Sequence, residues 1–336
     1  MNGELTVGVV GAGAIVQVAH LPVLSRMPEV RVVGICDNDV VKARAVAARF
    51  GVPRVYEDIE DLLEDADPEV VAVCTPNHLH EIHVRTALSA GKHVLCERPL
   101  ALSAAGVESI ISARDKAGRV VMVGMNHRFR SDVQALRTYL RTGELGAITG
   151  VRCGWYAFRP SGEGSTWRQR RERAGGGALL DLGLSLVDLA LWLTGCPKPK
   201  RVSAHLDRDG GDSEVEEAGC ALIVCEGDLS IIADVSRRYV GEQERFWFEI
   251  TGRLGSAKIH PLRIFREIRG VPTNVTPSGA ASREDAFTTS YRAEWAHFAA
   301  MVRGRVERSD LLDQVVLHRV MEALYRSAQE GRDIAL

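Results

Sequence analysis

The sequence predicts an α/β protein of two domains: a doubly wound parallel sheet in residues 1–125, and an α+β domain with a large, mostly antiparallel open sheet in residues 126–336. Three observations lead to this prediction. A chain of 336 residues exceeds the size of one typical core. Short β-branched runs alternate with helical patterns in the first part of the chain. Consecutive strand patterns separated by tight turns fill much of the second part.

Composition and charge exclude several classes of protein. The chain is 46% hydrophobic and 26% charged, and its formal net charge of −2 gives no electrostatic footprint for nucleic acid or an anionic membrane. Its seven cysteines include no CxxC pair, and several lie in apolar runs, as reduced core cysteines do. The apolar stretch 178–195 carries Asp181 and Asp188 and is too short and polar for a membrane span. Because the first strand pattern begins at Leu5, which leaves no room for a signal peptide, we expect a cytoplasmic protein.

Five short apolar runs in the first part of the chain predict parallel strands that are buried on both faces. Helical patterns separate these runs, and β-branched residues are frequent within them. One separating pattern, 39–51, ends in a glycine, as helix C-termini often do. The predicted strands are 5–10, 30–37, 68–76, 92–99 and 119–126.

A glycine-rich turn directly follows the first predicted strand. Gly11 and Gly13 let the backbone approach a pyrophosphate, whose charge then faces the N-terminus of the next helix. Val16 stands at the third fingerprint position, where glycine or alanine is usual, so a plain βα turn is the alternative. Asp37 ends the second strand where a carboxylate accepts hydrogen bonds from an adenosine ribose, which favours dinucleotide binding. The expected contacts here are Gly11, Gly13, Ala14, Ile15 and Asp37.

The residues that follow Asp37 favour NAD(H) over NADP(H). Asn38 and Asp39 come next, with no arginine alongside. The 2′-phosphate of NADP(H) would meet negative charge there. We therefore expect tighter binding of NAD(H).

The end of the strand 68–76 supplies further candidates, at the edge where an open α/β sheet binds its ligand. We expect Thr75, Pro76 and Asn77 to form a turn over the dinucleotide, and His80 to pack beneath its nicotinamide end. Histidines cluster in this segment, but no cysteine or carboxylate cluster completes a ligand set. We therefore predict no metal site.

The second part of the chain predicts a sheet that needs a partner. Strand patterns with tight turns between them indicate a mostly antiparallel sheet, with an acidic loop at 209–217 and two closing helices at 289–303 and 311–329. An open sheet with little helix coverage on one face usually buries that face against another subunit, so we expect a homodimer or homotetramer. The strand patterns after residue 200 are 201–208, 218–227, 228–236, 245–252 and 255–262.

Several motifs, in one order along nearly the whole chain, resemble the glucose–fructose oxidoreductase/inositol dehydrogenase (Gfo/Idh/MocA) family. They are GAGAIVQVAHLP, CDND, TPNHLH, GKHVLCERPLA, VGMNHRF and AGGGALLDLGLSLVDLALWLTG. The resemblance implies a Rossmann domain followed by an α/β domain whose sheet mediates oligomerisation. It also implies a nicotinamide cofactor, and a sugar, cyclitol or related polyol as substrate.

Two positions depart from the family pattern, and both handle protons in the family. The tripeptide that matches Glu97-Arg98-Pro99 normally has lysine in the middle, and the position of Ser185 normally holds histidine. Arginine cannot accept a proton near neutral pH because its pKa stays above about 12, and serine alone is no better as a base. Arg98 can instead polarise a carbonyl or stabilise an oxyanion, while Ser185 can orient a hydroxyl or relay a proton.

Asp181 is the leading candidate for the replacement base. It lies one helical turn before Ser185, so both side chains project from one helix face, after an AGGG run that lets the backbone approach a cofactor or substrate. The alternative is that Asp181 caps the helix or pairs with Arg98. Weaker candidates for proton transfer are Tyr156, His127 and His80.

Further expected contacts complete the predicted site. Trp167 and Arg168 match a pair that similar family members use near the nicotinamide or substrate, and a stacked surface Trp–Arg pair is the alternative. Asn126, at the predicted domain junction, is a candidate contact of the nicotinamide or its ribose. Glu97 and Arg98 are expected at the same crevice.

Three functions are compatible with these residues, and we expect the first. It is NAD(P)-dependent oxidation of a sugar, cyclitol or related polyol, with Arg98, Asp181 and Ser185 as the catalytic residues. The second is a non-redox step, such as elimination or epimerisation, with tightly bound NAD. The third is a redox-silent nucleotide- or sugar-binding regulatory protein, for which the replacement of lysine and histidine is the argument.

Overall fold

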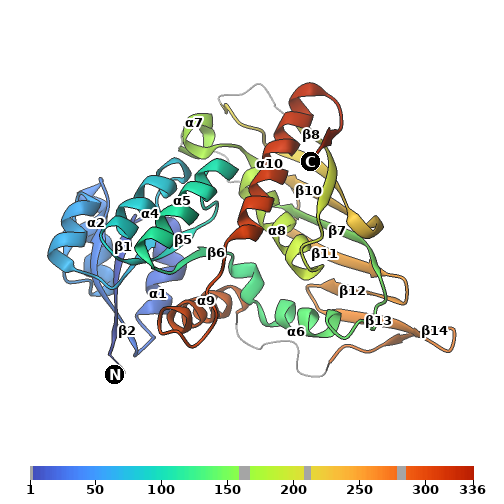
Figure 1. The fold of residues 1–336 in the computed structure, drawn as a ribbon, viewed down its shortest axis with the longest axis horizontal. Helices are drawn as coiled ribbons and strands as arrows, with labels where there is room; N and C mark the ends of the chain where they lie inside the picture. Colours follow the sequence, from blue (N-terminus) through green and yellow to red (C-terminus); the bar gives the residue numbers. More distant parts are fainter. Residues whose placement is uncertain (1–2, 159–166, 208–212, 278–284) are drawn as a thin grey trace. The chain divides into compact units, whose positions relative to one another are not determined.

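A computed structural model describes residues 3–158, 167–207, 213–277 and 285–336. The chain forms two compact units, unit 1 of residues 1–129 and 284–315 and unit 2 of residues 130–283 and 316–336 (Figure 1). The division expected at residue 125 therefore differs from the structure in its second part. The chain returns to unit 1 because α9 (Ala286–Val302) places Trp295 and Phe298 in the core of that unit.

Unit 1 is built on a parallel sheet, as the alternating pattern predicts. Within the described residues, six strands run in the order β3-β2-β1-β4-β5-β6, and each neighbouring pair is parallel. The strand order reverses at β1, so the carboxyl ends of β1 and β4 flank a topological switch point, where doubly wound sheets bind ligands. The strands are β1 (Leu5–Val10), β2 (Val30–Cys36), β3 (Val55–Tyr56), β4 (Val70–Val73), β5 (His93–Glu97) and β6 (Val121–Gly124).

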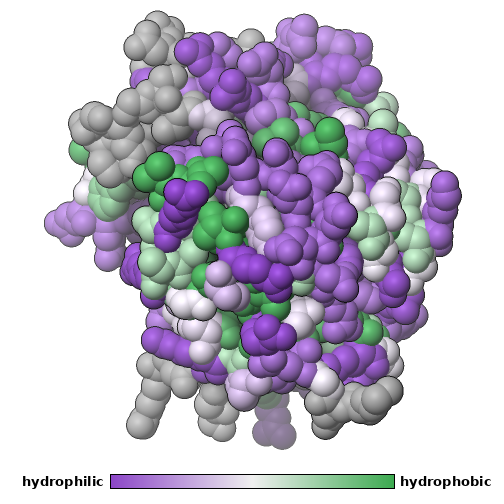
Figure 2. Space-filling model, turned by 90° about the vertical axis from the view of Figure 1, so that its left-hand side faces the viewer, coloured by the Kyte–Doolittle hydropathy of each residue, from purple (hydrophilic) through white to green (hydrophobic). Residues whose placement is uncertain are grey.

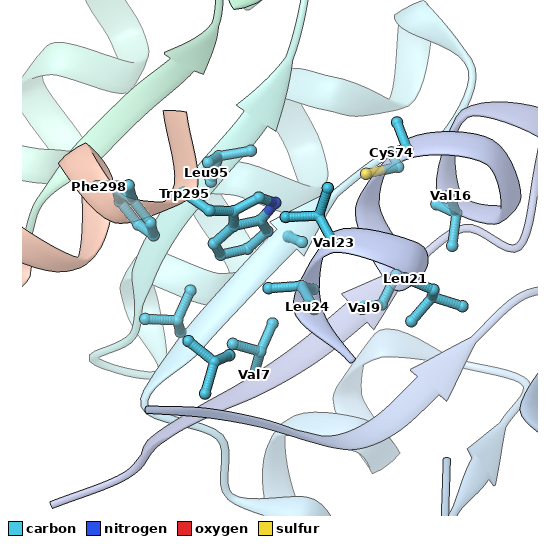
Figure 3. Close-up of a cluster of buried hydrophobic side chains, with 14 of the residues drawn as sticks. Val7, Val9, Val16, Leu21, Val23, Leu24, Cys74, Leu95, Trp295 and Phe298 are labelled. Carbon is cyan, nitrogen blue, oxygen red and sulfur yellow. The ribbon is translucent and has the colours of Figure 1, made fainter. Parts of the chain in front are cut away.

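Alternating side chains of β1 face two separate layers of unit 1. Val7 and Val9 lie in a core cluster with residues of α1, α2 and α9 (Figure 3). Gly8, between them, points the other way, since a Cβ there would meet Leu62 and Pro68. The helices are α1 (Leu21–Leu24), α2 (Val40–Phe50), α3 (Ile59–Asp61), α4 (His80–Ser89), α5 (Ala104–Ala117) and α9.

Unit 2 carries the predicted open sheet, which is mostly antiparallel. Its nine described strands run in the order β14-β13-β12-β11-β7-β10-β9-β8-β15, and the β7–β10 pair is parallel. The strands β13, β14 and β15 were not predicted. The strands are β7 (Ile148–Tyr156), β8 (Pro199–Asp207), β9 (Ala218–Cys225), β10 (Ser230–Ser236), β11 (Arg245–Gly252), β12 (Gly255–Ile259), β13 (Arg263–Ile268), β14 (Val271–Asn274) and β15 (Ile334–Ala335).

One apolar helix forms the core of unit 2. It is α8 (Leu184–Leu193), which continues from a π-helical turn at Leu179–Gly183 and packs on β7 and β10. The run Arg171–Leu193 is long and apolar enough to cross a membrane, contrary to the expectation from its length, but 89% of its most apolar window is buried inside the structure. Such burial is typical of a core helix. The other helices are α6 (Ser131–Leu140), α7 (Arg171–Ala174) and α10 (Leu312–Glu330).

The surface view in Figure 2 shows a mainly hydrophilic face, with hydrophobic residues gathered in small groups. Among the described side chains of unit 1, Val18, Val41 and Ile82 are large, hydrophobic and exposed. Scattered residues of this kind are normal on the surface of a globular protein.

Candidate functional site

The glycine turn after β1 is open on one side. Gly11 has a φ of +103°, and a Cβ there would lie 2.6 Å from the Cys74 carbonyl oxygen, so this position requires glycine. A Cβ at Gly13 would meet no protein atom within 4 Å. The larger Val16 is accommodated in the core cluster of unit 1, where it is fully buried. The turn therefore leaves space at Gly13 for a group that approaches the backbone closely, as a pyrophosphate does.

Asp37 ties the end of β2 to this turn. One carboxylate oxygen accepts a hydrogen bond from Ala12 N at 2.7 Å; the other accepts from Asp39 N and lies 2.9 Å from Lys42 Nζ. A carboxylate offers about four acceptor sites, which leaves capacity for ribose hydroxyls. Lys42 was not predicted as a site residue, although its place in the first turn of α2, capped by Asp39, was a readable signal.

His80 joins the turn after β4 to the turn after β5. Its two ring nitrogens lie 2.6 Å from the Pro99 carbonyl oxygen and 2.8 Å from that of Thr75. Burial lowers the pKa of His80, so the ring is neutral at pH 7 and donates to one of the two carbonyls. Because both nitrogens face backbone carbonyls, His80 positions the two turns and is poorly placed to exchange a proton with a substrate. Pro76 and Asn77 lead from the first turn into a 3₁₀ turn.

Glu97 ends β5, and Arg98 follows it. Glu97 Oε1 lies 2.9 Å from His20 Nε2, and the backbone N–H of Arg98 donates to Glu97 Oε2 at 3.3 Å. Burial raises the pKa of Glu97, but His20 and Arg98 outweigh it and the net effect is a lowered pKa. Glu97 is therefore a carboxylate next to a permanent cation. His20 was not predicted as a site residue.

Asn126 and His127 lie in a 3₁₀ turn after β6. The side-chain amide of Asn126 donates to Ser290 Oγ of α9 at 3.3 Å. This turn follows the carboxyl end of a parallel strand, so Asn126 stands at the same edge of the sheet as Gly11 and Asp37. Unit 1 thus gathers its predicted cofactor contacts along one edge.

The pocket helix of unit 2, defined here as residues 179–193, is anchored at its start by Glu216. Glu216 Oε1 accepts hydrogen bonds from the backbone N–H groups of Gly177 at 2.9 Å and Leu179 at 3.1 Å, and from the Tyr325 hydroxyl at 2.7 Å. A Cβ at Gly177 would lie 1.9 Å from the Glu216 carbonyl oxygen. The glycine run therefore admits protein groups, and a carboxylate satisfies the first N–H groups of the helix.

Arg237 connects the pocket helix to the acidic loop. Its guanidinium lies 3.8 Å from Asp181 and 3.3 Å from Glu217, and its side chain is 8% exposed. Asp181 thus pairs with an arginine within unit 2, and Ser185 is buried one turn further along the helix. Arg237 and Glu216 were not predicted. Of the acidic loop 209–217, residues 209–212 lie outside the described residues.

Two other candidates for the site have partners of their own. The Tyr156 hydroxyl donates to Asp234 at 2.6 Å, and this hydrogen bond, with burial, raises the pKa of Tyr156 to about 12. Its proton is therefore held strongly. The Arg168 guanidinium lies over the Trp167 ring at 4.4 Å from its centroid, which is the stacked pair of the alternative interpretation.

Cysteines and potential metal ligands were inspected in the same way. All seven cysteines are free, and burial raises the pKa of Cys74 and Cys96. Among the residues that the structure describes, no three His, Cys, Asp or Glu side chains gather as metal ligands.

Two family models match the chain and together cover more than half of it. One, described as an oxidoreductase family with an NAD-binding Rossmann fold, matches residues 5–125; the other, described as the GFO/IDH/MocA C-terminal domain, matches residues 133–258. The chain belongs to the Gfo/Idh/MocA family. The family and its oxidoreductase class, predicted from the motifs, are confirmed.

Gfo/Idh/MocA relatives match this chain over nearly its full length. D-glucoside 3-dehydrogenase of Escherichia coli is 27% identical over 100% of this chain and 98% of its own. D-xylose 1-dehydrogenase (NADP(+)) 2 of Haloferax volcanii is 28% identical over 98% and 99%. The crystal structure of GenD2 from gentamicin A biosynthesis, in complex with NAD, is similar with a TM-score of 0.86 and 28% identity, over 99% of this chain and 97% of that one. These names include both nicotinamide cofactors.

Proposed function

We propose that this protein is a nicotinamide-dependent oxidoreductase that acts on a secondary alcohol of a sugar, cyclitol or related polyol. The observation that carries the proposal is the turn at Gly11–Gly13, which is open at Gly13 and bonded to Asp37 at the switch point of the sheet. The names of the relatives support the substrate class. Unit 1 would bind the cofactor, and unit 2 would bind the substrate and mediate oligomerisation.

The cofactor contacts in this proposal lie along the carboxyl edge of the unit 1 sheet. The open turn would hold the pyrophosphate, and Asp37 would accept hydrogen bonds from the ribose hydroxyls. The loops joined by His80 would cover the nicotinamide end. The full proposed set is Gly11, Gly13, Ala14, Ile15, Asp37, Thr75, Pro76, Asn77, His80, Glu97, Arg98 and Asn126, with Trp167 and Arg168 from unit 2.

The chain's own residues must handle the proton of the substrate hydroxyl. When bound, the oxidised nicotinamide supplies the hydride acceptor. Arg98 keeps its proton and would stabilise negative charge on the substrate oxygen. Asp181 would accept the proton, and its carboxylate lies 3.8 Å from the Arg237 guanidinium. Ser185 would orient the hydroxyl.

We propose that NAD(H) is preferred over NADP(H). Asp37 and Asp39 bring negative charge to the position of a 2′-phosphate. Lys42 pairs with Asp37 at 2.9 Å, which reduces its attraction for a phosphate. Measured dissociation constants decide the matter, and tighter binding of NADP(H) would refute the preference.

We propose a homodimer or homotetramer formed through the unit 2 sheet, in the cytoplasm. Tyr156 and Trp247 form an edge-to-face pair on neighbouring strands β7 and β11, where a second subunit could cover them. Free cysteines throughout the chain suit a reducing compartment. Sedimentation that detects a monomer at micromolar concentration would refute the assembly.

A redox-silent binding protein is the second candidate function. The observation that favours it is the presence of Arg98 and Ser185 at the two proton-handling positions of the family pattern. Screening polyols, sugars and sugar acids for NADH formation separates the two candidates. The proposal predicts turnover of at least one of them; silence across a broad panel, with cofactor demonstrably bound, would favour the redox-silent protein.

A further inference from the structure

Three side chains from distant parts of unit 1 form one buried hydrogen-bonded chain. The indole N–H of Trp295 donates to His20 Nδ1 at 3.0 Å, and His20 Nε2 lies 2.9 Å from Glu97 Oε1. Trp295 and His20 are fully buried, and the Glu97 side chain is 12% exposed. This hydrogen-bonded chain ends at Glu97, which precedes Arg98 at the end of β5, where the proposed site lies.

The indole fixes the tautomer of His20. An indole N–H can only donate, so the Nδ1 atom that receives it must carry a lone pair. The single proton of a neutral imidazole then lies on Nε2, and His20 donates it to Glu97. This bond holds Glu97 as a carboxylate in one orientation, as an orienting partner holds a ligand or a catalytic side chain elsewhere.

The electrostatic surroundings of His20 favour the protonated ring, in contrast to this assignment. Burial lowers the pKa of His20, whereas Cys74 and Glu97 raise it, to about 10 overall. An imidazolium, however, would turn an Nδ1–H group toward the indole N–H, which is repulsive and takes away the lone pair that accepts the indole hydrogen bond. Burial also raises the pKa of Cys74, which makes that thiol neutral and removes the charge that would favour an imidazolium. The hydrogen-bond geometry therefore assigns a neutral His20.

Packing holds the rings of this chain in place. Trp295 lies among Leu95, Phe298 and Val23 in the buried cluster (Figure 3). Tyr291 contacts the His20 ring edge-on, at 5.2 Å between ring centroids. A buried, close-packed imidazole has little freedom to rotate away from Glu97.

We propose that Trp295 and His20 are positioning residues: Trp295 holds His20 in its neutral form with the proton on Nε2, and that N–H orients the Glu97 carboxylate beside Arg98. The hydrogen-bonded chain stands by itself, whereas its consequence for turnover rests on the oxidoreductase function proposed above. Glu97 accepts a hydrogen bond from the backbone N–H of Arg98, and the charge of Arg98, which cannot lose its proton, helps to lower the pKa of Glu97.

Apart from Arg98, burial disfavours the charged form of each titratable group that acts on Glu97 and His20. Burial raises the pKa of the Glu294 carboxyl and of the neighbouring thiols, and it lowers the pKa of His80. Glu97 and Arg98 therefore remain as the charged pair among these groups. The groups, from every element that packs here, are Cys74, His80, Cys96, Arg98, Tyr291 and Glu294.

The test is ¹⁵N NMR of the histidine side chains, with the His20 signals assigned by their loss in His20→Gln. In the wild-type protein we expect a neutral His20 with its proton on Nε2 and no titration across the neutral pH range. In Trp295→Phe, Nδ1 is released and the Glu97 carboxylate draws a second proton onto the ring, so His20 should titrate. A wild-type His20 that carries its proton on Nδ1, or protons on both nitrogens, would overturn the proposal without any variant.

A kinetic arm tests the consequence for the reaction. Trp295→Phe should lower kcat roughly tenfold and alter the acid limb of the pH profile, with the KM for NAD little changed. Phe298→Leu is the matched control: it also truncates a buried ring of α9, but it should leave both the His20 signals and the pH profile as in the wild type. If the protein proves redox-silent, the NMR result still decides the hydrogen-bonded chain. If the protein turns over substrate but Trp295→Phe and Phe298→Leu have the same pH profile, the positioning role is refuted and the proposed oxidoreductase function is not.

Discussion

The two glycine-rich turns of this chain look alike in sequence and serve different purposes. At Gly13, in unit 1, an added Cβ meets no protein atom within 4 Å. At Gly177, in unit 2, it would lie 1.9 Å from the backbone oxygen of Glu216, and at Gly176 it would lie 2.0 Å from the Tyr325 hydroxyl. The first turn is open to a ligand, whereas the second is filled by the protein itself.

This difference indicates that the first turn serves ligand binding and that the second turn serves the stability of unit 2. Both turns were expected to bring the backbone close to a cofactor or substrate, and in unit 2 the group that comes close belongs to the protein. That group is the Glu216–Tyr325 pair, which fixes the start of the helix that carries Asp181 and Ser185. Substitutions in the second turn should therefore change stability, and substitutions in the first should change ligand affinity.

The largest effect should come from removing the cation that ties the pocket helix to the acidic loop. Arg237→Met removes the ion pair that Arg237 forms with the buried Glu217 at 3.3 Å, so we expect a loss of about 3–5 kcal/mol in the free energy of unfolding. Denaturant unfolding measures it. The exposed pair Arg201–Asp333 provides the control, and Arg201→Met should change the free energy by less than about 1 kcal/mol. Equal effects of the two variants would contradict the role of Arg237.

Gly177→Ala should be next in size. The new methyl group overlaps the Glu216 backbone, which must shift, and we expect a loss of about 3 kcal/mol in the free energy of unfolding. The affinity of the folded variant for NAD should stay close to that of the wild type, because the glycine turn proposed to contact NAD is the one at Gly11–Gly13 in unit 1. A Gly177→Ala protein that is as stable as the wild type but binds NAD more weakly would contradict our interpretation of the two turns.

Gly13→Ala should show the opposite pattern. The methyl group meets no protein atom, so stability should change by no more than about 0.5 kcal/mol. The same methyl would occupy the space left for the pyrophosphate, and we expect the dissociation constant for NAD to rise at least about tenfold. Calorimetric titration of the folded variant measures it. Unchanged affinity would mean that no dinucleotide approaches this turn.

The smallest effect that we predict is a pH dependence of the free energy of unfolding, which arises from His93 in unit 1. Burial, with Arg119 and Arg308, lowers the pKa of His93 to about 4, and the backbone N–H of Val120 donates to its Nδ1. Since the folded pKa lies below the unfolded value of about 6.5, the unfolded state binds the proton more readily between these limits. The contribution of His93 to the free energy of unfolding is therefore fully present above about pH 6.5, and it should fall by about 1 kcal/mol by about pH 5.5. Unfolding curves of the wild type and His93→Leu check this, and an equal pH dependence in both would refute it.

Much of the fold could be predicted because its signals are local. The runs that became β1, β2, β4, β5 and β6 are short, β-branched and separated by helical patterns. The strands β3 and β15 have two residues each and form no readable period. The return of the chain to unit 1 through α9 depends on packing partners far away in sequence, which no local pattern reveals.

The site divides in the same way. Gly11, Gly13 and Asp37 were predicted because fixed spacing after a strand carries their chemistry. His20 and Trp295 were missed because their hydrogen bond joins residues 275 positions apart. Arg237 and Glu216 were missed for the same reason: a charged residue near a strand end looks exposed until the fold shows which carboxylate or N–H group it meets.

The most direct test of the account is calorimetric titration of the wild-type protein with NAD. We predict saturable binding that is weakened by Asp37→Ala as well as by Gly13→Ala, since Gly13 lies in the open turn after β1 and Asp37, at the end of β2, accepts a hydrogen bond from that turn. No binding of NAD or NADP to the folded protein would contradict the account at its base.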